Sequence, residues 1–265
     1  MQIVDNKAVL LRLRHPAKVT TVIPRSQALP NNQVIVKWGI DEAHVLKNLN
    51  IKVPSPIEGK YTWTGKHTPF DHQKTTASFL TMHKRAFCFN EQGTGKTASA
   101  IWASDYLLNA KVISRVLVIC PLSIMDSAWR NDLFTFAMHR RVGVAYGSKK
   151  KRTEVIESDA EYVVINYDGV NIIEEVIAKG GFDLIIVDEA THYKNAQTKR
   201  WKTLKRLMTS EPWLWMMTGT PAAQSPVDAF GLAKLVNPAA VPRFAGAFRD
   251  RVMAKVTNFK WVPKP

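Results

Sequence analysis

Residues 90–97 have the composition of a loop that binds phosphate: Asn-Glu-Gln-Gly-Thr-Gly-Lys-Thr. Gly93 and Gly95 allow the backbone to curl around a phosphate group with its N–H groups turned inward. Lys96 would then reach the β- and γ-phosphates of a nucleotide, and the hydroxyl of Thr97 would bind Mg²⁺. The alternative is a glycine-rich turn that binds nothing, because the strict pattern begins with glycine and this segment begins with asparagine.

An acidic pair follows a second apolar run of the chain. Asp188 and Glu189 come directly after Leu184–Val187, and charges at the end of a buried strand cost free energy unless something there needs them. We expect Asp188 to hold Mg²⁺, largely through water, and Glu189 to polarise the water that attacks the nucleotide. The alternative is that Asp188 only caps the following turn.

A third apolar run, Trp213–Met217, ends in a small polar segment, Thr218-Gly219-Thr220-Pro221. Hydroxyl side chains around a glycine are suited to transmit contacts between a nucleotide and a moving partner. Alone this segment is an ordinary turn. Its functional interpretation depends on its combination with the phosphate-binding segment and the acidic pair.

Residues 41–48 repeat the acidic pattern in a different context, as Asp-Glu-Ala-His-Val-Leu-Lys-Asn. The segment precedes the phosphate-binding loop, and no apolar run leads directly into it. We therefore predict a structural role, with Asp41 as the N-cap of a helix that places Val45, Leu46 and Leu49 on one face.

The elements that must position these side chains change character along the chain. Residues 1–66 contain short β-like runs separated by prolines, at 8–13, 18–23 and 33–38. From residue 68 onward, helical stretches alternate with apolar strands at 86–90, 115–120, 142–146, 162–166, 184–187 and 213–217. Continuous apolar strands between helices indicate a parallel sheet covered on both faces, in which ligands bind at the carboxyl ends of the strands. The predicted helices of this part span residues 97–108, 124–136, 170–178 and 197–208. We predict two domains, residues 1–60 and 61–265.

Composition restricts the class of protein. The chain has 265 residues, 37 Lys and Arg against 22 Asp and Glu, and a net charge of +15, which suggests a polyanionic partner. Cys88 and Cys120 lie in apolar runs, so we expect reduced core thiols rather than a disulfide framework. The N-terminus does not resemble a secretory signal, and the longest uncharged stretch, residues 212–227, is too short to span a membrane. These features predict a cytoplasmic protein.

Two basic clusters suggest where a nucleic-acid backbone would bind. The first is the run Lys149-Lys150-Lys151-Arg152, and the second follows the acidic pair, between Lys194 and Arg206. On the helix predicted there, Lys199, Lys202 and Arg206 share one face. A charged run is most often a solvated face, but two such clusters in a strongly basic chain favour phosphate contacts that do not depend on base sequence.

Taken in order, these segments resemble the Swi/Snf-like branch of superfamily-two helicases and translocases over roughly residues 68–250. The segments that carry the resemblance are Phe70-Asp71-His72-Gln73, residues 90–97, residues 118–123 with Trp129, Tyr146-Gly147-Ser148 with Arg152, Ile165-Asn166-Tyr167, residues 188–195, and residues 218–221.

The resemblance implies an α/β fold, a RecA-like P-loop NTPase with a parallel sheet and helices on both faces, preceded by a small β-rich domain. It implies ATP and Mg²⁺ as cofactors, DNA as partner, and a helicase or duplex translocase acting in DNA replication, recombination or repair. It assigns the nucleotide to Gln73, which reads adenine, and to Gly93, Thr94, Gly95, Lys96 and Thr97. It assigns catalysis to Lys96, Asp188 and Glu189, and the metal to Thr97 and Asp188. Nucleic-acid contacts fall on Pro121, Ser123, Lys149, Lys150, Lys151, Arg152, Tyr167 and Lys194, and coupling on Thr218, Gly219 and Thr220.

Two departures from the family pattern affect these expectations. Thr191 stands where the acidic motif usually has histidine, so coupling between ATP and nucleic acid is expected to be altered. Motors of this branch have a second lobe that carries arginine fingers, and residues 241–265 are too few to form one. We therefore expect slow hydrolysis unless a second lobe is supplied in cis or in trans. The alternative function is a non-catalytic module for binding nucleic acid or a partner, built on a relict lobe. Residues 1–66 also show a weak resemblance to phage-encoded relatives, which would place the protein in a host cytoplasm.

Overall fold

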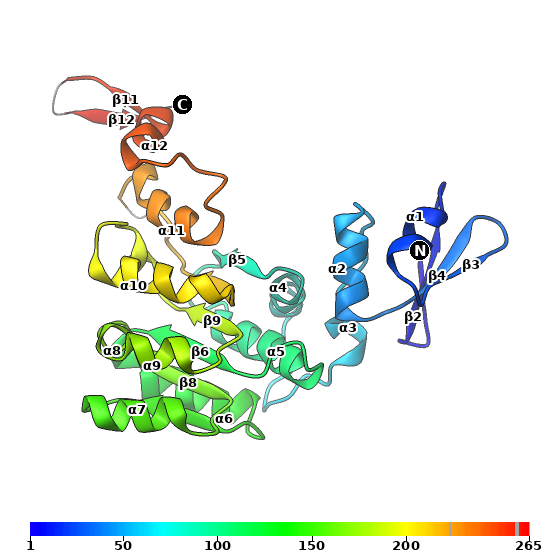
Figure 1. Ribbon diagram of the computed structural model, residues 1–265, viewed down its shortest axis with the longest axis horizontal. Coiled ribbons are helices and arrows are strands. Elements are labelled where there is room, and N and C mark those ends of the chain that lie inside the picture. Colours follow the sequence, from blue (N-terminus) through cyan, green and yellow to red (C-terminus); the bar gives the residue numbers. More distant parts are fainter. Residues whose placement is uncertain (223, 258–259, 265) are drawn as a thin grey trace. The chain divides into compact units, whose positions relative to one another are not determined.

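The computed structural model describes residues 1–222, 224–257 and 260–264 (Figure 1). The chain divides into two compact units, Met1–His83 and Lys84–Pro265. The first unit therefore extends beyond the small domain predicted for residues 1–60 and includes one further helix, and the predicted domain limits stay a prediction.

The first unit is built on an antiparallel sheet of four strands in the order β1-β2-β4-β3. The side chains of Val9, Leu11, Val34 and Val36 alternate along β2 and β4 and point into a small apolar core. The strands are β1 (Gln2–Val4), β2 (Ala8–Arg12), β3 (Gln27–Leu29) and β4 (Gln33–Lys37), and the helices are α1 (Ala17–Val22), α2 (Ile40–Asn48), α3 (Ile57–Lys60) and α4 (Asp71–Thr81).

The strand predicted at residues 18–23 is wrong, because the chain forms helix α1 there. Val19 and Ile23 are both buried in the core of the small sheet. Residues four apart lie on the same face of a helix, so a helix buries both of them together. Tertiary packing thus overrides the β propensity of the valines and threonines in this segment.

Helix α2 confirms the structural role predicted for residues 41–48, although Asp41 is not its N-cap. The N-cap is Gly39, and Asp41 lies in the first turn. The helix begins at Ile40, and the side chain of this residue is buried. Leu46 packs in the core with Val45 and Leu49 beside it, as the periodicity predicted.

The second unit contains the predicted parallel sheet, with six strands in the order β5-β10-β9-β6-β8-β7. The strands are β5 (Arg85–Cys88), β6 (Val116–Cys120), β7 (Val142–Ala145), β8 (Tyr162–Asn166), β9 (Leu184–Val187) and β10 (Trp213–Met217). The last three have the predicted limits. β6 and β7 each differ by one residue at one end, and β5 differs at both ends, by one and two residues. The described part of the chain therefore has the α/β fold that the sequence predicted.

Helices cover both faces of this sheet. Residues of α7 to α11 form one apolar core with alternate strand residues such as Leu117, Val163 and Ile185. On the opposite face, the hydroxyls of Tyr162 in β8 and Ser104 in α5 lie 2.8 Å apart. The helices are α5 (Lys96–Asn109), α6 (Asn131–Phe136), α7 (Lys149–Glu157), α8 (Tyr167–Ile172), α9 (Glu174–Lys179), α10 (Lys199–Leu207), α11 (Ala229–Val236) and α12 (Ala245–Val252), followed by the hairpin of β11 (Met253–Lys255) and β12 (Trp261–Pro263).

Two of the predicted helices are interrupted. The stretch 170–178 is divided between α8 and α9. The stretch 124–136 begins with a π-helical turn, Met125–Arg130, and continues as α6. Single π turns occur frequently at functional sites, and this one lies close to the acidic pair.

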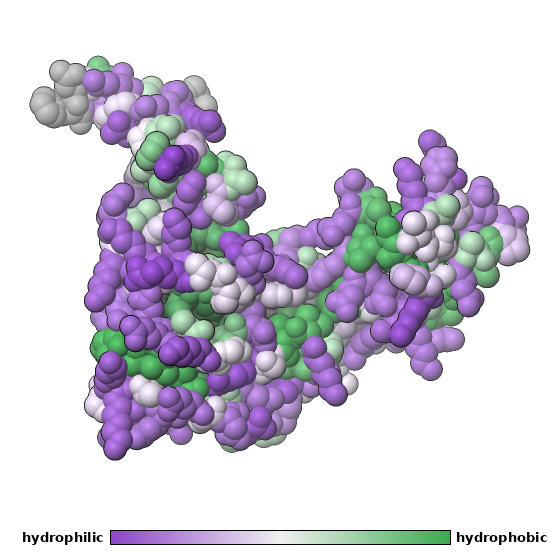
Figure 2. Space-filling model, viewed as in Figure 1, coloured by the Kyte–Doolittle hydropathy of each residue, from purple (hydrophilic) through white to green (hydrophobic). Residues whose placement is uncertain are grey.

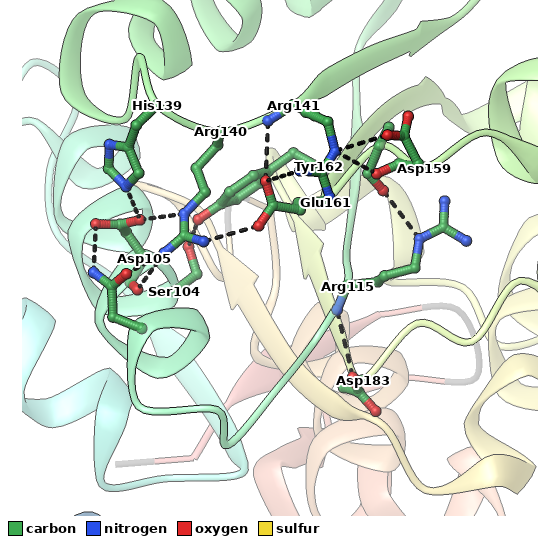
Figure 3. Close-up of polar contacts among 12 residues, drawn as sticks. Ser104, Asp105, Arg115, His139, Arg140, Arg141, Asp159, Glu161, Tyr162 and Asp183 are labelled. Carbon is green, nitrogen blue, oxygen red and sulfur yellow. Dashed lines mark hydrogen bonds and ion pairs between the residues drawn. The ribbon is translucent and has the colours of Figure 1, made fainter.

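The amino-terminal edge of the sheet holds a dense polar cluster (Figure 3). Asp105 of α5 is fully buried, and one of its carboxylate oxygens lies 2.6 Å from Nε of Arg140 and 2.9 Å from Nε2 of His139. Arg140 also donates to Glu161, the residue before β8, at 2.8 Å. A buried carboxylate with these partners fixes α5 against the sheet, on the edge opposite the predicted nucleotide site.

Two exclusions made from composition can be compared with the structure. No helix in the described ranges is long and apolar enough to cross a membrane. Cys88 and Cys120 are free thiols in the core, as predicted, and burial raises the pKa of both.

Candidate nucleotide site and nucleic-acid interface

The register of the sheet brings the predicted site segments to one edge. Cys88 of β5 pairs with Met217 of β10, and Met216 pairs with Val187 of β9. Val187 also pairs with Ile119 of β6. The phosphate-binding segment, the acidic pair and the Thr-Gly-Thr segment each begin within two residues of these aligned positions. They therefore leave the sheet side by side at its carboxyl edge, where parallel sheets bind ligands.

The loop between β5 and α5 has the conformation that a phosphate-binding loop needs. Gly93 and Gly95 both have φ of +77°, in the left-handed region that favours glycine. The ammonium group of Lys96 donates to the carbonyl oxygens of Asn90 and Glu91, at 2.9 and 2.8 Å. These two bonds hold Lys96 against its own loop, and a Cβ on Gly93 would meet no other atom within 4 Å. Asparagine in place of the first glycine leaves this arrangement intact.

Asp188 is buried at the end of β9, and both of its carboxylate oxygens accept hydrogen bonds. Nε1 of Trp129 donates to Oδ2 and the backbone N–H of Glu189 donates to Oδ1, each at 2.9 Å. Burial raises the pKa of Asp188, whereas these two hydrogen bonds and the charge of Lys96 oppose the rise. Asp188 and Lys96 are therefore close enough to interact electrostatically.

The residues present fit a magnesium ion of the kind the sequence predicts. No cluster of three or more Asp, Glu, His or Cys side chains suited to a metal occurs among the described residues. Mg²⁺ in nucleotide sites keeps several waters and is held by one or two protein oxygens and the phosphates, so it needs no such cluster. The carboxylate of Asp188 and the hydroxyl of Thr97, at the start of α5, are oxygen donors of the right type.

Glu189 adopts a conformation that is rare for a residue with a side chain. Its φ and ψ are +46° and +54°, in the left-handed region. Its carbonyl oxygen accepts the N–H of His192, and it also lies 3.3 Å from the hydroxyl of Tyr167. Non-glycine residues in this conformation occur often at functional sites, and this one turns the chain sharply after β9.

The segment after β10 contacts the phosphate-binding loop through a glycine. The N–H of Thr218 donates to the carbonyl of Cys88 at 3.0 Å, and Thr218 is fully buried. A Cβ on Gly219 would lie 3.4 Å from the backbone nitrogen of Gln92. Thr220 is exposed, and its N–H donates to the hydroxyl of Thr218. The two segments are therefore in direct contact, and the coupling role of residues 218–220 stays a prediction.

Tyr167 links the acidic pair to a cationic side chain. Its buried hydroxyl donates to the carbonyl oxygen of Asp188 at 2.5 Å. The guanidinium of Arg200 lies over the Tyr167 ring, 4.7 Å from its centre, and donates to Asp168. The ring of His192 packs at the same distance. Desolvation and the charge of Arg200 lower the pKa of His192, which favours its neutral form near pH 7.

The first basic cluster lies in the first turn of α7 and divides into two environments. Lys149, Lys150 and Lys151 are exposed, and the surface over α7 is hydrophilic in Figure 2. Arg152 is buried and donates to the carbonyl of Ala145 at 2.6 Å. It also donates to Oδ1 of Asn166, at 2.9 Å, so its guanidinium connects the ends of β7 and β8.

The second basic cluster is also divided. Lys194 donates to Asp228 at 3.2 Å, and Arg206 pairs with Glu174 through two nitrogens. Lys199 and Lys202 are exposed on α10. On the opposite side of that helix Trp201, Leu204 and Met208 are buried, as predicted.

The remaining predicted site residues lie in different environments. Pro121 is half-buried, and Ser123 is exposed at the start of the segment after β6. Gln73 belongs to the first unit, where its side-chain oxygen accepts the N–H of Phe70 at 3.0 Å. These placements do not test the predicted roles, which stay predictions.

Sequence reasoning missed two contacts at this edge. It grouped Trp129 with the segment after β6 but gave its indole no acceptor, and it did not place Arg200 over Tyr167. Both contacts join side chains more than 30 residues apart. Spacing along the chain carries no signal for such pairs.

Comparisons with known proteins agree with this geometry. A family model described as the SNF2-related domain matches residues 72–258. The chain is 25% identical over 170 residues to the SWI/SNF-related matrix-associated actin-dependent regulator of chromatin subfamily A-like protein 1 homolog of Caenorhabditis elegans, covering 63% of this chain and 24% of that protein. It is 27% identical over 151 residues to the uncharacterized ATP-dependent helicase MG018 of Mycoplasma genitalium, covering 56% of this chain and 14% of that protein.

A solved structure gives a similar result. The Sulfolobus solfataricus SWI2/SNF2 ATPase core in complex with dsDNA superposes with a TM-score of 0.62 at 25% identity, covering 71% of this chain and 39% of that chain. This chain thus spans about a quarter or less of the two curated relatives. All three come from cellular organisms and give no support to a phage origin.

Proposed function

Because this chain belongs to the family of SNF2-related domains, we propose that its second unit is the ATP-binding first lobe of a DNA-dependent translocase or helicase. Residues 72–258 match that family, and ATP is the nucleotide that an SNF2 ATPase domain implies. The observation that carries the proposal is the alignment of β5, β9 and β10, which brings the glycine loop, the acidic pair and the Thr-Gly-Thr segment to one edge.

The roles we propose follow from chemistry at that edge. Lys96 leaves its two carbonyl partners and binds the β- and γ-phosphates, together with the inward N–H groups of residues 93–97. Thr97 and Asp188 hold Mg²⁺, which when bound neutralises charge on the phosphates. Glu189 orients the attacking water. The role of Gln73 in reading adenine, which the family resemblance implies, stays a prediction.

DNA is the proposed polyanion. The solved relative was crystallised with double-stranded DNA, and this chain carries a net charge of +15. Lysines in the first turn of a helix oppose its dipole, so three of them at the start of α7 favour a function over a structural role. We propose that Lys149, Lys150 and Lys151 contact phosphates, together with Ser123, whereas Arg152 acts by holding the strand ends beneath them.

The activity of the whole protein is also a proposal, because the chain covers 39% of the solved ATPase core. In the family that the motifs of this chain resemble, a second lobe supplies arginine fingers. An arginine finger raises the rate of hydrolysis by about 10³–10⁵-fold. We propose that residues 1–265 bind Mg-ATP by themselves and hydrolyse it slowly until such a lobe is present.

A nucleotide-binding titration tests the proposal. The fluorescence of a labelled ATP analogue is measured against protein concentration, with Mg²⁺, for the parent and for Lys96→Ala. We expect at least a ten-fold weaker affinity for the variant, because it lacks the cation that reaches the phosphates. Lys179→Ala, which removes an exposed lysine at the opposite edge of the sheet, is the matched control. Equal affinity for Lys96→Ala and the parent would refute the phosphate-loop assignment.

A further inference from the structure

The indole of Trp129 is fully buried, with its single polar atom directed at the acidic pair. Its relative exposure is 0%, and Nε1–H donates to Oδ2 of Asp188 at 2.9 Å. A buried tryptophan normally places its N–H against an acceptor. Here that acceptor is the carboxylate to which we assign Mg²⁺, and not a backbone carbonyl of the core.

Trp129 belongs to the segment that connects β6 to α6. The chain leaves β6 at Cys120, forms a short 3₁₀ turn at Leu122–Ile124, and then the π-helical turn Met125–Arg130. Trp129 lies in this π turn, directly before α6. One short segment therefore joins the exposed Ser123 to the buried Asp188.

The donor type matters at this position. An ionised carboxylate buried at a strand end needs donors to offset its lost hydration. A lysine or arginine would supply them but would add a positive charge that repels a metal ion. An indole N–H is a neutral donor, so it orients the carboxylate and leaves its negative charge available to a cation.

We propose that Trp129 is a positioning residue for magnesium, which holds the carboxylate of Asp188 in its metal-binding orientation and connects the metal site to the segment after β6. The inference rests on the proposed function and deepens it. Groups that hydrogen-bond to a metal-binding side chain orient it, and their loss typically weakens metal binding by about 10–100-fold.

Trp129→Phe removes the N–H and keeps an aromatic ring in the core. Binding of a labelled nucleotide is measured without Mg²⁺ and then against increasing Mg²⁺. We expect unchanged affinity without the metal and about a ten-fold or greater rise in the Mg²⁺ concentration needed for half of the metal-dependent effect. Trp201→Phe is the matched control, because it loses one buried indole hydrogen bond of 2.8 Å, to the carbonyl of Gly231, away from the site.

The indole N–H resonances give a readout that does not depend on activity. The chain has eight tryptophans, and the signal of Trp129 is the one absent from Trp129→Phe or, failing that, from Trp129→Tyr. We expect Asp188→Asn and the addition of Mg-ADP each to shift this signal, with the signal of Trp201 unchanged.

The outcomes separate the two proposals. A parent that shows no metal-dependent nucleotide binding refutes the proposed function and this inference with it. A parent that binds Mg-nucleotide, with Trp129→Phe matching Trp201→Phe in its Mg²⁺ dependence, overturns the inference alone. A Trp129 signal that Asp188→Asn leaves unmoved also overturns it.

Discussion

The hydroxyl of Tyr167 donates to the backbone carbonyl of Asp188 at 2.5 Å, and so joins the residue after β8 to the residue after β9. The carbonyl belongs to the metal-site residue, while the tyrosine ring lies under Arg200. Arg200, Tyr167 and Asp188 therefore form a continuous series of contacts that ends at the acidic pair. We propose that this chain of contacts serves coupling between nucleotide and nucleic acid in a chain that has Thr191 where the family pattern has histidine.

Removing that hydroxyl should destabilise the second unit. Tyr167→Phe leaves the ring in place but deprives a buried carbonyl of its donor, which costs about 1–3 kcal/mol. Chemical denaturation measures the loss. Tyr146→Phe, at an exposed tyrosine, is the control and should change stability by less than about 0.5 kcal/mol. Equal stability of Tyr167→Phe and the parent would show that the hydrogen bond contributes nothing.

The buried carboxylate of Asp105 should stabilise the fold and make no contribution to nucleotide binding (Figure 3). Asp105→Ala removes the fully buried partner of Arg140, and breaking a buried ion pair costs about 3–5 kcal/mol. Asp159→Ala removes the exposed partner of Arg141 instead and should cost less than about 1 kcal/mol.

Thermal and chemical unfolding measure both variants of this pair. Nucleotide affinity of Asp105→Ala is then compared with the parent at a temperature where both remain folded. A comparable cost for the two substitutions would contradict the structural role assigned to Asp105, and weakened nucleotide binding in the folded variant would contradict the separation of the two sheet edges.

The exposed lysines of α7 should set the salt dependence of DNA binding. Replacing Lys149, Lys150 and Lys151 by glutamine should weaken binding to duplexes of any sequence and reduce the slope of log affinity against log salt by about one per lost phosphate contact. Arg206→Gln is the control, because Arg206 is already paired with Glu174. Fluorescence anisotropy at several salt concentrations measures both. An unchanged slope for the triple variant would remove α7 from the interface.

The pair of Glu174 and Arg206 should make a pH-dependent contribution to stability. The hydrogen bond from Arg206 lowers the pKa of Glu174 in the folded protein. The pair therefore stabilises the fold above the ordinary pKa of glutamate, near 4.3, and this contribution is lost as pH falls through the lowered value. Arg206→Gln should be less stable than the parent at pH 7, with a difference in unfolding midpoint that shrinks towards pH 3. A difference independent of pH would contradict this assignment.

Much of the second unit could be predicted from the sequence, because its signals are local. Apolar runs such as Leu184–Val187 stand between polar turns. Such a pattern is typical of a parallel strand that is buried on both faces. Gly93 and Gly95 indicate a loop with left-handed backbone conformations, which few other residues adopt without a cost in conformational energy. The order of segments then brings the candidate site together by topology alone.

Other features of the fold and of the candidate site depend on contacts between residues that are distant in the sequence. The segment at residues 18–23 has strand propensity, yet burial of Val19 and Ile23 makes it a helix. Arg152 looked like a surface cation, but it is buried because the ends of β7 and β8 present it with a carbonyl and an amide oxygen. The acceptor of Trp129 is Asp188, which follows β9 and lies 59 residues further along the chain. Tertiary partners decide such cases.

Hydrogen exchange measured by mass spectrometry, with and without Mg-ADP, tests the central claim most directly. If nucleotide binds at the carboxyl edge of the sheet, peptides that contain residues 90–97, 188–189 and 218–220 should become protected, while peptides around His139 and Arg140 at the opposite edge should not change. Protection absent from residues 90–97, or confined to the opposite edge, would contradict the account.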